Sequence, residues 1–345
     1  MVKLLSKKIF WLISILILGI IFFIGSFFLI KPKVTEIIPP PAQVPLPIEE
    51  KPITIILVGD IMLNRGVEYM IKKEGDGDFK FPFLEIAKDL NGADILFGNL
   101  EGPISDKGTK VGSIYSFRAE PEAIEGLSFA GFDILSLANN HAFDYGRAAL
   151  EDCLAKLSNA KISYVGAGLN EIEAFGPVIK EINGSTSSPL RIGFLAYTNL
   201  GPESWKATSE NLGIARVSEK DMEKVKESIK SAKEKVDILI VSLHAGEEYA
   251  AEPTQFQVEF SKAAVDAGAD LVVGHHPHVV QKSEKRYKDK WIFYSLGNFV
   301  FDQSFSEETM KGEMLEILIE DGKINELIPK KIKLNNYFQP VVDSQ

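Results

Sequence analysis

The histidines of this chain are concentrated in three short motifs, each of which follows an apolar run. The five histidines occur in LANNHAFDYG (His141), VSLHAGEEY (His244) and VVGHHPHVV (His275, His276 and His278). Neutral imidazole is a common metal ligand and a frequent general acid or base, whereas histidines used only for packing would be scattered. The concentration of this residue type predicts one site for metal binding or acid–base chemistry.

Carboxylate and amide side chains occupy similar places in the sequence. Asp60 ends the run ITIILVGD, Asn99 and Glu101 end ILFGNLE, and Asn140 directly precedes His141. Together with histidine, these residue types offer the oxygen and nitrogen donors that Mn, Fe, Zn or Mg sites use. The sequence therefore predicts a divalent-cation site built from these motifs.

Composition excludes several other classes of protein. The single cysteine, Cys153, excludes an intrachain disulfide framework and a thiolate zinc site, and a packing role is expected for it in the run ALEDCLAKL. The formal net charge is −10, with lysines interspersed among glutamates, which argues against a nucleic-acid partner. The apolar fraction of 45% is large enough for a substantial core.

An alternation of strands and helices is expected to position these motifs. Apolar runs such as ITIILVGD, FDILSLANN and VDILIVSLH alternate with helix-like segments such as GRAALEDCLAKLSNA and QFQVEFSKAAVDAG. Continuous apolar strands indicate a sheet that is covered on both faces, and ligands of open α/β sheets bind at the carboxyl ends of the strands. We predict one α/β domain over residues 53–335, followed by a C-terminal tail over 336–345.

The N-terminal segment is predicted to cross a membrane. Residues 9–30 form an uncharged apolar run with lysines on both sides, of the length that a bilayer requires. An uncleaved anchor is favoured over a cleavable signal peptide, because the run is long and Gly25-Ser26 makes a poor cleavage site. Residues 1–8 are then cytoplasmic, and the proline-rich stretch 31–52 is an extended linker to an extracytoplasmic domain.

Six ordered motifs resemble those of the CapA (PgsA) family of poly-γ-glutamate capsule biosynthesis proteins, a branch of the calcineurin-like metallophosphoesterase superfamily. They are GDIMLNR (59–65), GNLEGPI (98–104), ANNHAFDYG (138–146), LHAGEEY (243–249), GHHPHVVQ (274–281) and SLGNFVFDQ (295–303). The resemblance covers residues 53–333. It implies an α/β fold, a metallophosphoesterase-like four-layer αββα sandwich preceded by one transmembrane helix, and a centre for one or two divalent cations (Mn, Fe, Zn or Mg).

The resemblance also implies roles for individual residues. The implied metal ligands are Asp60, Glu101, Asn140, His244, His276 and His278. His141 is implied to be catalytic, because the corresponding histidine of the superfamily protonates the leaving oxygen of a phosphoester. We expect contacts to substrate, or support for the ligands, from Asn99, Arg65, Glu247, His275, Asn298 and Asp302. His275 is expected to face away from His276 and His278, because alternate side chains of an extended stretch share a face.

Structural roles are the alternatives for several of these residues. Asn139 could cap a helix that starts near Gly146 or hydrogen-bond a turn. Glu247 and Glu248 could orient His244, contact substrate or belong to a solvated loop. In the same way, an anion contact and a surface ion pair are both open for Arg65, and Asn298 and Asp302 could be purely structural.

Two positions depart from the superfamily pattern. Met62 stands where the first motif would have the histidine of Asp-x-His, and Asn99 stands where a bridging aspartate would lie. A thioether is a poor ligand for a hard cation, so one of the two metal sites is expected to be weak or absent.

The expected function is that of a membrane-anchored protein of poly-γ-glutamate synthesis or export with a metal-dependent phosphoesterase-like hydrolase site. Its substrate would be a phosphoester or the anionic polymer, and its partners would be capsule synthase or export subunits. The alternative is a non-catalytic component of a capsule or envelope complex, which binds polymer or metal.

Overall fold

The structure is a computed structural model that describes residues 2–28, 52–111, 113–183, 188–282 and 284–343. The chain divides into two compact units, residues 1–49 and 50–345, and each is described by itself. The first unit contains helix α1 (Val2–Phe28), in which Lys7–Gly25 is long and apolar enough to cross a membrane. Residues 29–51, which include nearly all of the expected linker, lie outside the described residues.

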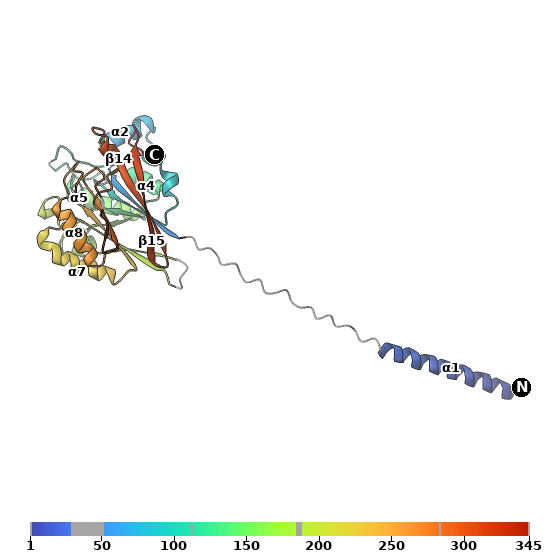
Figure 1. Ribbon diagram of the computed structural model, residues 1–345. Coiled ribbons are helices and arrows are strands. Elements are labelled where there is room, and N and C mark those ends of the chain that lie inside the picture. Colours follow the sequence, from blue (N-terminus) through green and yellow to red (C-terminus); the bar gives the residue numbers. More distant parts are fainter. Residues whose placement is uncertain (1, 29–51, 112, 184–187, 283, 344–345) are drawn as a thin grey trace. The chain divides into compact units, whose positions relative to one another are not determined.

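The second unit is built on two sheets (Figure 1). The strands of the first are β1 (Ile53–Ile61), β2 (Ile95–Leu100), β3 (Ile134–Ser136), β4 (Ser163–Val165), β13 (Asn298–Val300), β14 (Lys311–Glu320), β15 (Lys323–Leu334) and β16 (Pro340–Val342). Those of the second are β6 (Val178–Ile182), β7 (Leu190–Thr198), β9 (Ile238–His244), β10 (Leu271–His275), β11 (Glu284–Tyr287) and β12 (Lys290–Phe293). A small separate pair consists of β5 (Ala167–Gly168) and β8 (Gly213–Ile214).

The central strands of both sheets run parallel. The first sheet has the order β16-β15-β14-β1-β2-β3-β4, with β13 also paired to β1, and the second has the order β11-β12-β10-β9-β7-β6. Strands β1 to β4 are parallel neighbours, as are β7, β9, β10 and β12. Parallel neighbours end at the same edge, so the polar residues that follow these strands are brought together.

Helices cover the outer faces of the sheets. The longer ones are α2 (Arg65–Glu74), α4 (Ala123–Ala130), α5 (Gly146–Asn159), α7 (Met222–Lys233) and α8 (Gln255–Asp266). Shorter ones are α3 (Ala87–Leu90), α6 (Glu171–Phe175) and the 3₁₀ turns Phe81–Phe83, Glu203–Trp205, Glu219–Asp221 and Glu308–Met310. The buried residues of α2, α4 and α5 pack in one core with the first sheet, and those of α7 and α8 pack in another with the second sheet.

A third core lies between the sheets and completes four layers. Ile55 and Leu57 of β1 belong to it, and Phe97 of β2 stacks on Phe194 of β7 with the ring centroids 5.5 Å apart. Alternate residues of the same strands, such as Ile56, face the helices instead. The expected four-layer αββα sandwich is confirmed.

The folded unit extends further towards the C-terminus than residue 335. Strand β16 lies in the stretch 336–345, which was expected to be a tail, and Val342 pairs with Ile332 of β15. A turn that Asn335 and Gln339 close through a backbone hydrogen bond of 3.0 Å leads into this strand. A run as short as Pro340–Val342 has no periodic apolar pattern, so only the pairing reveals it.

Candidate metal centre

The alternation of side chains along the strands explains why polar residues are buried between the sheets. Ile240 of β9 packs in the core between the sheets, so His244, four residues later, faces the same layer. In β10, Val273 is in this core and His275 follows it two residues later. The polar residues of the site therefore lie at the edge of the apolar core between the sheets.

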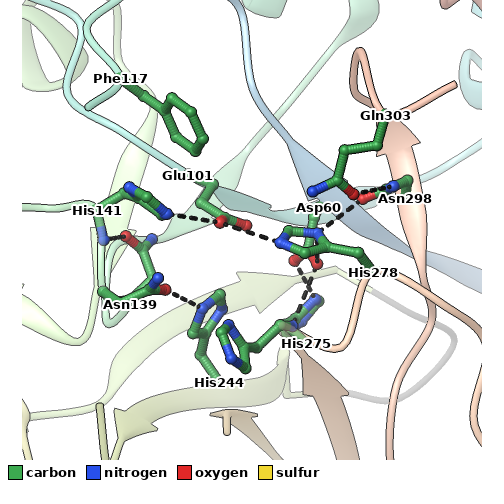
Figure 2. A network of polar contacts seen from close by, with 12 residues as sticks. Asp60, Glu101, Phe117, Asn139, His141, His244, His275, His278, Asn298 and Gln303 are labelled. Atoms are coloured by element: carbon green, nitrogen blue, oxygen red, sulfur yellow. Dashed lines mark hydrogen bonds and ion pairs between the residues drawn. The ribbon is translucent and has the colours of Figure 1, made fainter. Parts of the chain in front are cut away.

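Asp60 is the centre of the polar network (Figure 2). Its carboxylate accepts hydrogen bonds from Asn99 Nδ2 at 2.8 Å and from the backbone N–H of His276 at 3.2 Å. The Nδ1 atoms of His275 and His278 each lie 3.4 Å from a carboxylate oxygen of Asp60. Burial alone would raise the pKa of Asp60, but the contacts with the two histidines outweigh it and hold the pKa well below its usual range. Asp60 is therefore an anion at neutral pH.

Asn298 fixes the tautomer of His278. Asn298 Nδ2 donates to the carbonyl of Thr309 at 2.9 Å, so Asn298 Oδ1 faces His278 Nδ1, which lies at 2.9 Å. Because that oxygen can only accept, Nδ1 carries a proton, and in the neutral ring the lone pair is on Nε2. His278 Nε2 lies 3.6 Å from Glu101 Oε1, so its lone pair is directed at the site.

Glu101 is buried, and its carboxylate has no hydrogen-bond partner at either oxygen among the described residues. The Nε2 atom of His141 lies 3.5 Å from Glu101 Oε1, and that of His278 lies 3.6 Å from the same oxygen. Burial raises the pKa of Glu101 to about 7. For His278, burial would lower the pKa, but the carboxylates of Glu101 and Asp60 outweigh it and raise the pKa to about 9. Without a cation, protons occupy the place that a cation would take.

Two groups of donors have the geometry of a metal site. Asp60, Glu101 and His278 each offer a ligand atom, and these atoms all lie within 4.8 Å of one another. Glu248, His276 and His278 form a second group under the same limit, with Glu248 exposed and both histidines buried. An unpartnered buried carboxylate is costly, and carboxylate with imidazole is the donor set of Mn, Fe or Zn. The residues therefore fit a divalent cation.

His141 is held with one ring nitrogen towards this site. Its Nδ1 lies 2.6 Å from Asp144 Oδ2, so the carboxylate accepts a hydrogen bond from Nδ1–H and Nε2 is left for the site. The ring stacks on Phe117 with the centroids 4.0 Å apart (Figure 2). Asp144 Oδ2 also accepts the backbone N–H of Phe117 at 2.7 Å, which ties the three residues together.

Asn139 makes a turn and does not cap a helix. Its Oδ1 accepts the backbone N–H of His141 at 3.1 Å, whereas α5 begins after Tyr145 and has no side-chain cap. Asn139 Nδ2 donates to the carbonyl of Leu100 at 2.8 Å and to Asn99 Oδ1 at 3.3 Å. Of the two alternatives for Asn139, the hydrogen-bonded turn is the one that the structure shows.

Asn99 connects the first sheet to His244. Because its Oδ1 accepts from Asn139, its Nδ2 faces Asp60 and also His244 Nδ1 at 3.2 Å. His244 Nδ1 is then an acceptor, and Nε2–H donates to Asn140 Oδ1 at 2.7 Å. Burial lowers the pKa of His244 well below its usual value, so the ring is neutral. His244 and Asn140 are thus joined to each other by a hydrogen bond, and their role as metal ligands stays a prediction.

The expectation that His275 faces away from the other two histidines was wrong. Strand β10 ends at His275, and the backbone then turns through left-handed conformations at His276 (φ 99°) and His278 (φ 57°). The stretch is therefore not extended, and the two-residue alternation does not apply beyond β10. All three rings are buried, and the centroids of His276 and His278 are 5.9 Å apart.

Arg65 and Asp302 form an ion pair of 3.1 Å at the rim of the site. Asp302 also accepts the backbone N–H of Gly66 at 2.8 Å, which anchors the start of α2. The Arg65 guanidinium lies 5.3 Å from the ring centroid of Phe117, the ring on which His141 stacks. Arg65 is therefore held near the site by its ion pair.

The structure brings Glu248, not Glu247, to the histidines. Glu247 is exposed and belongs to neither donor group among the described residues, whereas Glu248 belongs to the group with His276 and His278. Met62 is fully buried in the core beneath the helices, where its Sδ accepts the backbone N–H of Asn64 at 3.1 Å. Met62 therefore does not act as a metal ligand in place of the histidine that the superfamily has at this position.

Sequence reasoning missed Asp144 and Phe117. Asp144 had a signal, because it follows His141 by three residues in ANNHAFD and a carboxylate at that spacing can orient the ring. Phe117 lies far from every histidine motif in the sequence, and nothing local marks it.

Comparisons with known proteins agree with this architecture. The crystal structure of a hypothetical protein from Thermus thermophilus shares the fold, with a TM-score of 0.50 and 16% identity over 81% of this chain and 99% of that chain. The capsule biosynthesis protein CapA of Bacillus anthracis is 34% identical over 83% of this chain and 69% of its own length. The PGA biosynthesis protein CapA of Bacillus subtilis is also 34% identical, over 72% of this chain and 63% of its own length.

The match to a protein family covers most of the second unit. Residues 54–303, from β1 to the last of the six motifs, match the family described as bacterial capsule synthesis protein PGA_cap. All the residues expected to form the site lie in this range. The chain belongs to the PGA_cap family of bacterial capsule synthesis proteins.

Proposed function

We propose that the chain is a membrane-anchored accessory protein of poly-γ-glutamate capsule synthesis or export, and that its domain is a divalent-cation-dependent hydrolase of the phosphoesterase type. The similarity to the Bacillus CapA proteins supports the capsule role, and the long apolar helix α1 supports the anchor. The observation that carries the hydrolase is Glu101, a buried carboxylate without a hydrogen-bond partner that lies between His141 and His278.

Asp60, Glu101 and His278 would hold the cation. When bound there, it would polarise a phosphoryl oxygen of the substrate. Asn99 orients the Asp60 carboxylate by its hydrogen bond of 2.8 Å, and Asn298 directs the lone pair of His278 Nε2 inward. The ligands are thus held in place by partners that do not themselves need to bind metal.

His141 would supply the proton for the leaving oxygen. Asp144 holds the ring with Nε2 towards Glu101, and Phe117 packs against its face. Side chains that are fixed in this way lose little orientational freedom during proton transfer. Arg65, held beside Phe117 by Asp302, is placed to contact the negative charge of the substrate.

The test is hydrolysis of p-nitrophenyl phosphate and bis-p-nitrophenyl phosphate by the full-length chain in detergent, loaded with Mn²⁺ or Zn²⁺. His141→Gln is expected to lower kcat by about 100-fold or more, because the general acid is lost, with the metal content unchanged. Glu151→Gln, an exposed position on α5, is the control and should retain wild-type turnover. Equal turnover of wild type and His141→Gln would refute the proposed role of His141.

A second candidate function is the binding of an anionic polymer without turnover. It is favoured by Met62, which lies in the core where the superfamily would have a ligand. A metal-loaded chain that hydrolyses neither ester but retains fluorescent poly-γ-glutamate, and releases it on chelation, would establish this second function in place of the first.

A further inference from the structure

We propose that Glu248 is a metal ligand, which completes the solvent side of the cation site together with His276 and His278. The inference rests on the proposed cation centre and adds to it a residue outside the ligand set that the sequence predicts. The ligand atoms of Glu248, His276 and His278 lie within 4.8 Å of one another.

The first argument is the state of His276. The residue is only 5% exposed, and its buried Nδ1 has no hydrogen-bond partner among the described residues. A buried ring nitrogen without a partner is costly unless a ligand meets it. A cation held by Glu248 would satisfy that nitrogen.

The second argument is that the backbone fixes the position of Glu248. The loop that carries it is bonded to the histidine turn on both sides, by Ala245 N–H to the carbonyl of His275 at 3.1 Å and by Tyr249 N–H to the carbonyl of Pro277 at 2.8 Å. Tyr249 itself has a left-handed backbone (φ 65°), a conformation that persists only where the surroundings impose it. An exposed side chain on a loop held in this way has a defined direction.

Gln281 also bonds to the loop that carries Glu248. It is buried, and its Nε2 donates to the carbonyls of Ala250 at 2.9 Å and Glu252 at 3.0 Å. Gln281 Oε1 accepts a hydrogen bond from Gln257 Nε2 of α8 at 2.9 Å, so Gln281 connects the loop to this helix as well. Gln281, the last residue of the motif GHHPHVVQ, thus holds the loop of Glu248 in place.

The third argument concerns the number of ions. Because Nδ1 of His278 donates to Asn298, its single lone pair on Nε2 can bind only one ion. The group of Asp60, Glu101 and His278 and the group with Glu248 share His278, which points to one ion held between them. Glu248 is then the ligand of that ion nearest to solvent.

The experiment is a titration of the chelator-treated full-length chain in detergent with Mn²⁺, in competition with a fluorescent chelator. Glu248→Gln is expected to weaken Mn²⁺ binding by about 10-fold or more, since even partners behind metal ligands are worth 10- to 100-fold. Glu247→Gln removes the adjacent carboxylate and should leave the affinity within about 2-fold of wild type. Glu248→Asp, which keeps a carboxylate on a shorter side chain, should lie between wild type and Glu248→Gln.

The outcomes separate this inference from the proposed cation centre. If wild type binds Mn²⁺ and Glu248→Gln binds it equally well, the ligand role of Glu248 is overturned while the centre stands. If wild type binds neither Mn²⁺ nor Zn²⁺, the centre itself is overturned. The melting temperatures of the metal-free chains identify a folding defect, and in that case Glu248→Asp decides: an affinity above that of Glu248→Gln supports the inference, and an equal one refutes it.

Discussion

At the scale of single residues, the chemistry of the site depends on pairs in which one side chain fixes the proton of the other. Asn298 determines which nitrogen of His278 carries the lone pair, and Asp144 does the same for His141. Such partners decide which ring nitrogen faces the site.

Asp144→Asn should impair turnover without impairing metal binding. The amide oxygen can still accept both hydrogen bonds, but the negative charge that stabilises a protonated His141 ring is lost, so kcat should fall by about 10-fold or more. KM and Mn²⁺ affinity should stay close to wild type, because the side chain contacts neither Asp60 nor His278. Steady-state kinetics beside a Mn²⁺ titration checks this, and an unchanged kcat would contradict the role of Asp144.

The metal-free chain should become less stable as the pH rises from about 6.5 to about 9. The folded-state pKa of His278 is raised from 6.5 to about 9, so its stabilisation is complete below 6.5 and is lost as the pH passes through 9. Glu101 acts in the same direction at the lower end of this range, because its pKa is raised from 4.5 to about 7 and its stabilisation is lost as the pH passes through 7. Melting temperatures at about pH 6.5 and about pH 8.5 test this.

Mn²⁺ provides the control for this pH dependence. A cation replaces the protons on Glu101 and His278, so saturating Mn²⁺ should remove most of the fall in melting temperature. A metal-free chain that is equally stable or more stable at the higher pH would show that the two groups do not titrate as described.

At the scale of elements, close approaches of the backbone put the chemical residues at the ends of their strands. A Cβ on Gly59, which precedes Asp60, would lie 2.0 Å from the carbonyl oxygen of Gly297. A Cβ on Gly274, which precedes His275, would lie 2.0 Å from the carbonyl oxygen of Tyr294. The glycines of GD and GH are therefore needed for the packing of neighbouring segments.

Gly274→Ala should destabilise the domain strongly. The added methyl group would meet rigid backbone, so β10 and the segment at Tyr294 must separate, at a cost of about 3 kcal/mol or more. Gly92→Ala is the matched control, since a Cβ there has no atom within 4 Å. Denaturant unfolding compares the two, and similar stabilities of both variants would rule out the close approach.

At the scale of the whole molecule, the chain combines an apolar helix with a domain of the PGA_cap family. A helix as apolar as α1 is stable in a bilayer because its backbone groups are bonded within the helix. The helix and the folded domain can each be tested separately.

The full-length chain is expected to stay in the membrane fraction after a carbonate wash, with an intact mass of 38.2 kDa. Deletion of residues 2–28 removes the apolar helix and should release the protein into the soluble fraction. A shortened mature protein in the soluble fraction would identify the segment as a cleaved signal instead.

The sequence by itself determined the α/β class of the fold and the strands that carry the chemistry, whereas the four layers were implied by the resemblance. Continuous apolar runs such as β9 and β10 predicted covered sheets, and the polar residues after them predicted a common edge. These are local patterns, and burial of apolar surface acts on each run in the same way wherever it lies in the chain. The structure brings together Asp60, Glu101 and all five histidines of these motifs.

Only the tertiary structure decided which way the side chains face and which neighbours fix them. His275 turns towards Asp60, Glu248 rather than Glu247 reaches the histidines, and Phe117 packs on His141. Each of these contacts joins segments that are distant in the sequence or follows a left-handed turn, where alternation no longer applies. Long-range packing sets these directions, and no local pattern in the sequence records it.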